Sequence, residues 1–95
     1  MRIYKYDISL TDHVRLSLPK DARILDAQIQ GARLRLWAVV DPDAPHETVE
    51  FRIIGTGHPI IDYRPDWGHV STVQDREFVW HIFRVPSGEA QKERK

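Results

Sequence analysis

The chain has 95 residues, a net charge of zero from 14 basic and 14 acidic side chains, and no cysteine. This length allows one domain with one modest core. The lack of cysteine excludes disulfides, thiolate chemistry, cysteine-ligated zinc and iron–sulfur clusters. The neutral balance argues against bulk attraction to nucleic acid or to an anionic membrane, and it leaves little repulsion to oppose assembly into a homo-oligomer.

Alternation of apolar and polar side chains marks the first two strands. Residues 3–10 and 14–18 both alternate in this way, which is typical of half-buried strands. Pro19 ends the second run, because proline has no N–H to donate to a neighbouring strand. The link Thr11-Asp12 is short enough to predict that these two strands form a hairpin.

Residues 23–40 predict a second hairpin around a two-residue turn. Gly31-Ala32 separates two alternating runs, and glycine supplies the positive φ that a type II′ turn needs at its first position. The second arm is apolar at every position from 36 to 40. This pattern is typical of a strand buried on both faces and places Trp37 in the core.

Three more strands are predicted after a proline-containing loop at residues 41–45. Residues 48–54 alternate again, and 70–74 form a short strand. The last strand, 77–85, is apolar on both faces, which predicts that Trp80 is also a core residue.

Seven short strands without any helical periodicity predict a mostly β protein. We expect a single antiparallel β domain over residues 1–85, built as a sandwich or a partly open barrel. Residues 86–95 predict a disordered, charged C-terminal tail. No apolar run approaches the roughly 18 residues of a membrane helix, and the N-terminus lacks the apolar stretch of an export signal, so we expect a cytoplasmic protein.

The connection at residues 55–68 is the best candidate for a functional site. It is longer than most loops in compact domains, and binding groups tend to lie on loops held by a rigid sheet. Its glycines are not followed by the third glycine or the lysine of the phosphate-binding motifs with known mechanics. A looser nest of backbone N–H groups remains open, as does the alternative of a bulge and a turn. The predicted ligand-binding residues are Arg52, Gly55, Thr56, Gly57, His58, Asp62, Tyr63, Arg64 and Trp67.

These residue types would suit a nucleotide. Arginine binds phosphate, Tyr63 or Trp67 would stack on a base, and Asp62 would bind a base edge or a ribose hydroxyl. The alternative for Trp67 is that it folds down as a cover on the core.

Catalysis and metal binding have weaker support. The five histidines lack the spacing of metal ligands, so we expect no metal site and no cofactor. A small hydrolase that uses His58 with Asp62 is the alternative, although no recognisable nucleophile motif accompanies them. We therefore expect a protein that is not an enzyme.

Three sequence blocks are similar to a small family of uncharacterised phage and prophage proteins. They are residues 36–45, residues 51–60, and residues 72–75 with 78–83. The resemblance covers nearly the whole folded length. It implies a phage context and a location in the host cytoplasm, and it assigns no role to any residue.

This context favours a non-catalytic binding protein that acts in counter-defence. One version sequesters a nucleotide second messenger, so that its partner is a small anionic ligand. The other blocks a host defence protein by means of exposed apolar surface at residues 59–61 and Tyr63. A virion structural or assembly protein is a further alternative.

Overall fold

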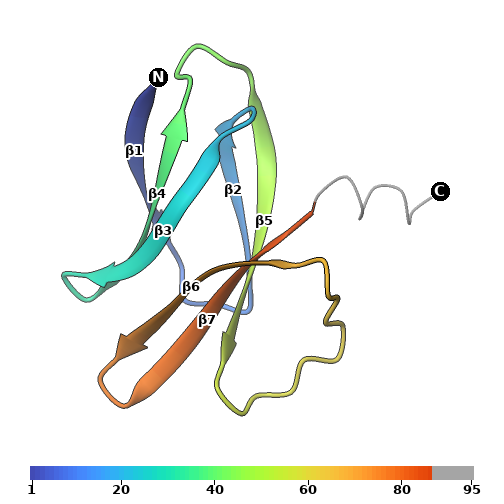
Figure 1. The fold of residues 1–95 in the computed structure, drawn as a ribbon. Helices are drawn as coiled ribbons and strands as arrows, with labels where there is room; N and C mark the ends of the chain where they lie inside the picture. Colours follow the sequence, from blue (N-terminus) through green and yellow to red (C-terminus); the bar gives the residue numbers. More distant parts are fainter. Residues whose placement is uncertain (87–95) are drawn as a thin grey trace.

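The computed structural model describes residues 1–86, which fold into seven antiparallel strands without a helix (Figure 1). The predicted mostly β, single-domain fold is confirmed, and with no helix in this range there is none that could span a membrane. The predicted tail lies outside the described residues from position 87 onward. The strands are β1 (Arg2–Ile8), β2 (His13–Pro19), β3 (Arg23–Gln30), β4 (Arg33–Val40), β5 (His46–Gly55), β6 (Gly68–Asp75) and β7 (Phe78–Val85).

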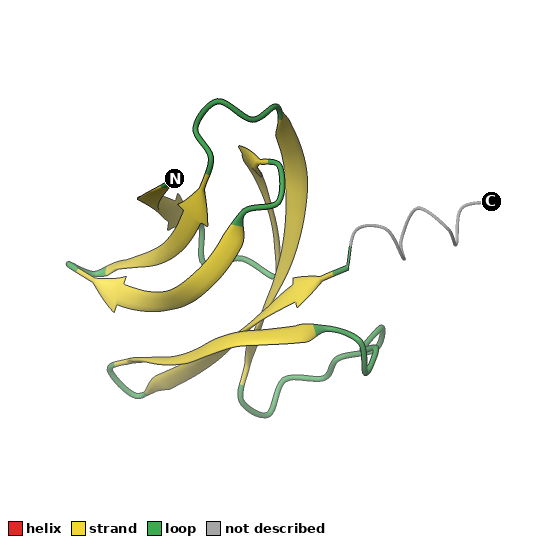
Figure 2. Cartoon of the chain, turned by 45° about the horizontal axis from the view of Figure 1, so that its top comes forward, coloured by secondary structure: helices red, strands yellow, loops and turns green. Residues whose placement is uncertain are grey.

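The strands form two sheets, in the orders β1-β4-β3 and β2-β5-β7-β6 (Figure 2). The predicted hairpin between the first two strands is therefore wrong. β1 pairs with β4 and β2 pairs with β5, while residues 9–12 carry the chain from one sheet to the other. The pairing with β4 sets Ile8 opposite Leu34, so that both apolar side chains reach the core.

The hydrophobic core lies between the two sheets. β4 contributes every second residue to it, and β5 and β7 contribute from the opposite side. Leu36, Phe51 and Ile82 are fully buried, and each such side chain stabilises the fold by about 1.5–3 kcal/mol. The core extends through Ile8, Val14, Leu18, Ala22, Ala27, Leu34, Ala38, Val40, Val49, Ile53 and Val73.

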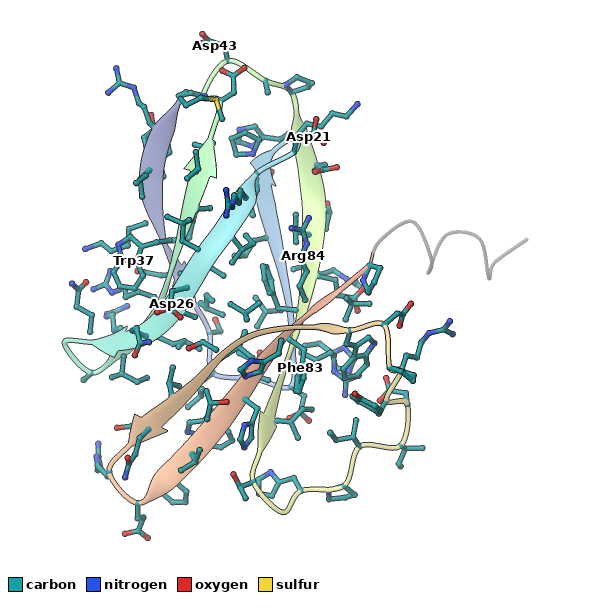
Figure 3. The ribbon with its side chains drawn as sticks, viewed as in Figure 1. Asp21, Asp26, Trp37, Asp43, Phe83 and Arg84 are labelled. Carbon is teal, nitrogen blue, oxygen red and sulfur yellow. The ribbon has the colours of Figure 1, made fainter. Side chains whose placement is uncertain are left out.

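The prediction that β4 is buried on both faces is wrong. Trp37 projects away from the second sheet (Figure 3), and it is only partly buried because no strand within residues 1–86 packs on the outer face of the three-stranded sheet. An antiparallel sheet can leave one face in water in this way. Only Ile82 of β7 is buried, and Trp80 packs at the margin of the core.

The predicted hairpin of residues 23–40 is confirmed, but its turn is of another type. Gly31 has φ 58° and Ala32 has φ 66°. Positive φ at both central positions is the signature of a type I′ turn, whereas the predicted type II′ turn has it only at the first. Ala32 therefore adopts a left-handed conformation that its Cβ disfavours.

The two sheets approach each other at β3 and β6, which are edge strands of different sheets (Figure 1). Each of these strands carries a bulge, between Ile24 and Asp26 in β3 and between His69 and Ser71 in β6. A bulge bends an edge strand and redirects its side chains. The two sheets therefore meet along a seam between β3 and β6, without joining into one sheet.

Candidate functional site

The connection between β5 and β6, residues 56–67, is hereafter the 56–67 loop, shown at the lower right of Figure 1. Its first residue is fixed to the sheet, because the Thr56 N–H donates to the Val79 carbonyl at 3.1 Å. Each end is also a local turn. The His58 N–H donates to the Gly55 carbonyl at 3.0 Å, and the Trp67 N–H donates to the Arg64 carbonyl at 3.1 Å.

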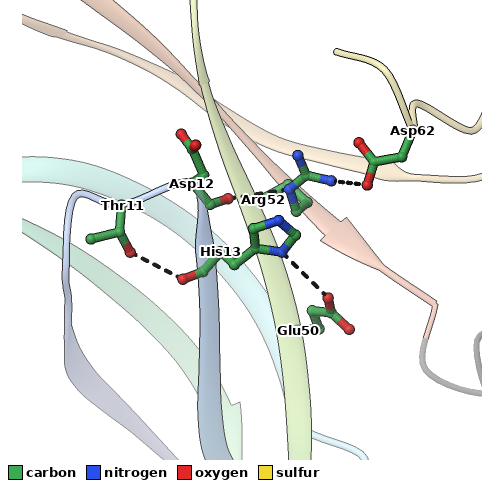
Figure 4. A network of polar contacts seen from close by, with 6 residues as sticks. All are labelled: Thr11, Asp12, His13, Glu50, Arg52 and Asp62. Atoms are coloured by element: carbon green, nitrogen blue, oxygen red, sulfur yellow. Dashed lines mark hydrogen bonds and ion pairs between the residues drawn. The ribbon is translucent and has the colours of Figure 1, made fainter.

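Arg52 holds the middle of the loop to the sheet. Arg52 is only 7% exposed, although its side chain points away from the main core. Nη1 donates to Oδ2 of Asp62 at 2.5 Å, and Nε donates to the Asp12 carbonyl at 3.2 Å (Figure 4). The guanidinium carbon also lies 4.9 Å from the centre of the Trp67 ring. A buried charge needs such partners, and here two of them come from the loop.

Aromatic side chains of the loop pack against aromatic side chains of the four-stranded sheet, apart from the main core. Trp67 is 7% exposed, and its ring centre lies 5.8 Å from that of Phe83 and 5.5 Å from that of Tyr63. His69 contacts Phe83 from β6, with ring centres 5.6 Å apart. Phe83 stands opposite Arg52, on the outer face of the four-stranded sheet. Trp67 therefore covers this face, and a base would reach its ring only after the loop moved.

Arg52 lowers the pKa of Asp62. The hydrogen bond from Arg52 holds the pKa of the Asp62 carboxyl below its ordinary value, with smaller contributions from the charges of Arg52 and His13. The Asp62 side chain is 59% exposed, so water weakens this pair, whereas the Arg52 side chain is 9% exposed. The main role of Asp62 is therefore to give the buried Arg52 guanidinium an anionic partner.

Gly55, at the end of β5, and Gly57, in the loop, both have structural roles. A Cβ on Gly55 would lie 2.8 Å from two atoms of the His58 ring, so the imidazole packs directly on the glycine backbone. The same ring meets Trp80 edge-on, with centres 6.1 Å apart. Gly57 has φ 88°, which favours glycine. The turn of the bulge-and-turn alternative is therefore present, but the bulge is not, because β5 stays in register with β7 as far as Gly55.

The residues of the hydrolase alternative do not come together. Within residues 1–86 no hydrogen bond or ion pair joins His58 to Asp62. The Thr56 hydroxyl instead contacts Nε2 of His81 at 2.7 Å. The described part of the chain also contains no group of three or more side chains placed to hold a metal ion.

A polar chain on the outer face escaped the sequence analysis. The Thr72 hydroxyl lies 3.0 Å from Nδ1 of His81 and 2.9 Å from Nε2 of His69, and His81 continues to Thr56. Thr72 stands opposite His81 in the ladder between β6 and β7. Alternation within each strand signals which side a residue faces, but only the register between strands brings these four groups together.

The two apolar side chains next to Asp62 are exposed, although Asp62 itself is bound to Arg52. Ile61 is 98% exposed and Tyr63 is 50% exposed. Arg64 lies 3.5 Å from Asp66 and is also engaged. The predicted apolar surface of the loop is thus centred on Ile61.

Residues 1–93 match the family described as domain of unknown function DUF7352. The chain belongs to this family. No curated protein and no solved structure matches the chain. Membership confirms the expectation of an uncharacterised family. It assigns no role to the predicted site residues.

Proposed function

We propose that the protein is a phage-encoded, non-catalytic binding protein that blocks a host defence protein through the 56–67 loop. The observation that carries the proposal is the 98% exposure of Ile61 at the tip of a loop that is tied down on both sides. An apolar anchor on a preorganised segment loses little entropy on binding. The phage context and the host cytoplasm rest on the resemblance of the sequence blocks and belong to the proposal.

The pinning of the loop is what makes it suitable for a protein partner. Asp62 adjoins Ile61 and is held by Arg52, and Trp67 is buried a few residues later. Ile61 therefore extends from a short segment with fixed ends. We propose that it enters an apolar pocket of the partner, with Tyr63 packing beside it.

The nucleotide-sequestering version is less well supported at these residues. The Arg52 guanidinium is already bound to Asp62 and lies against Trp67. A phosphate would have to displace the carboxylate, and a base would have to lift the Trp67 ring. The protein-blocking version requires neither change.

The test is capture from a lysate of the host bacterium. The immobilised protein, its Ile61→Asp variant and an Ile3→Asp control are compared by quantitative mass spectrometry. Ile3 is a matched control, since it is an exposed isoleucine (62%) on β1, in the other sheet. We expect one defence protein that both the wild type and Ile3→Asp retain, and that Ile61→Asp retains about tenfold less.

Neither substitution should disturb the core, so a difference in retention can be assigned to the binding surface. Both side chains are exposed, so melting temperatures should stay within a few degrees of that of the wild type. Equal retention of every host protein by Ile61→Asp and by the wild type would reject the loop as the binding surface.

A further inference from the structure

A groove of about 510 Å³ lies at the seam between the two sheets, outside the 56–67 loop. One wall is the start of β3 with the turn before it, and the other is the start of β6. The bulge of each strand falls at this seam, and bulges are frequent beside functional sites. The lining residues are Asp21, Ala22, Arg23, Ile24, Leu25, Gly68, His69, Val70 and Arg84.

Two arginines contribute positive charge to the groove. Arg84 comes from β7 and is half-buried, and Arg23 is the first residue of β3 (Figure 3 labels Arg84 and Asp21). Within residues 1–86 neither guanidinium has a hydrogen bond or an ion pair. This sets them apart from Arg35 and Arg52, which both bind aspartates.

Of the two arginines, Arg84 gives the stronger evidence that the groove binds an anion. It stands opposite Phe51 in the ladder, two residues after Ile82, and so shares the core-facing side of the sheet. A guanidinium held in a half-buried position without an anion loses hydration, and no group within residues 1–86 replaces it. An external anion would supply the missing partner.

The remaining lining is suited to an apolar or planar group. Ile24 and Val70 lie on opposite walls, and the bulge of β3 leaves Leu25 45% exposed at the groove. Asp21 is the one carboxylate of the lining, and its backbone N–H is held by Glu47 at 3.1 Å. The lining therefore keeps one net positive charge beside apolar side chains.

We propose that this groove binds a nucleotide-sized phosphate ester. Arg84 and Arg23 bind the phosphate, whose oxygens match the fork of N–H donors on a guanidinium. The base packs between Ile24, Leu25 and Val70. The volume falls in the range of roughly 300–1,000 Å³ that is typical of small-molecule sites. The proposal is independent of the protein-blocking loop.

The experiment is a titration of the ¹⁵N-labelled protein, followed by NMR, with AMP, cyclic AMP, cyclic di-AMP and inorganic phosphate. We expect at least one nucleotide to shift amide signals in residues 21–25, 68–70 and 84. Arg84→Ala and Arg23→Ala should each weaken that nucleotide by about tenfold. The control Arg15→Ala removes an exposed arginine from β2, in the four-stranded sheet and outside the groove lining, and should leave the affinity unchanged.

Three results would overturn the proposal. They are no saturable shift with any of the nucleotides, shifts that map away from the groove, and affinity that survives both arginine substitutions. Inorganic phosphate that binds as tightly as the best nucleotide would overturn the role of the apolar wall. Arg23 is exposed, so its variant keeps the test valid if Arg84→Ala unfolds. Ile61→Asp should bind the nucleotide normally, which separates this proposal from the function of the loop.

Discussion

Replacement of Trp67 by alanine should destabilise the protein and release the 56–67 loop. The ring is 7% exposed and lies between Phe83, Tyr63 and the Arg52 guanidinium. A buried tryptophan removes about 150–250 Å² from water, which is equivalent to about 4–6 kcal/mol at 25 cal/mol per Å². Truncations of buried aromatic residues cost about 3–5 kcal/mol when measured.

The expected cost for Trp67→Ala is about 3 kcal/mol, at the lower end of that range. The ring covers the outer face of a sheet and not the main core, so the loop can open locally and thereby limit the loss. Opening would also expose Arg52 to water, which partly offsets the lost cation–π contact.

Urea unfolding gives the free energy, and amide hydrogen exchange locates the change. The amides of Thr56, His58 and Trp67, which donate to backbone carbonyls, should exchange faster in Trp67→Ala. The control is Trp37→Ala, which removes the same side chain from the outer face of β4. It should lower stability without changing exchange in the loop. Unchanged loop exchange in Trp67→Ala, with a loss below about 1 kcal/mol, would refute this reasoning.

Two further predictions concern the turn and the ion pair. Ala32→Gly should stabilise the fold by about 1 kcal/mol in thermal unfolding, because glycine accepts the left-handed conformation at φ 66° without strain; a lower melting temperature would contradict the type I′ assignment. Asp62 has a lowered folded-state pKa, so its contribution is complete above its unfolded pKa of about 4 and is lost as the pH falls through the folded value. The stability difference between the wild type and Asp62→Asn should therefore be constant near neutral pH and shrink in acid, and a difference that is independent of pH would contradict the pairing with Arg52.

The sequence predicted local features of the fold well, because they depend on neighbours in the chain. The seven strands and the position of the turn at Gly31-Ala32 follow from alternation and from turn chemistry, although the type of the turn does not. The partners of each strand do not follow, since β1 and β2 are adjacent in sequence but lie in different sheets. Residues 36–40 suggested burial on both faces, yet the outer face stays half-exposed because no other strand of the described part of the chain packs on it.

The sequence predicted which face of the sheet Arg52 occupies, but not the contacts that its side chain makes there. Alternation in β5 correctly placed Arg52 on the face of the sheet away from the core. The loop then folds back over it and supplies Asp62 and Trp67 as partners. Arg23 and Arg84 are far apart in sequence and meet at one groove only through the approach of β3 to β6, which no local pattern encodes.

The most direct measurement of the central claim is site-specific photo-crosslinking in the host cell. A photoreactive amino acid replaces Ile61 in one variant and Ile3 in another, and both positions are exposed. The account predicts one discrete adduct with a single host protein from position 61 and no such adduct from position 3. The same adducts from both positions, or none from position 61 in infected cells, would contradict the assignment of the 56–67 loop as the binding surface.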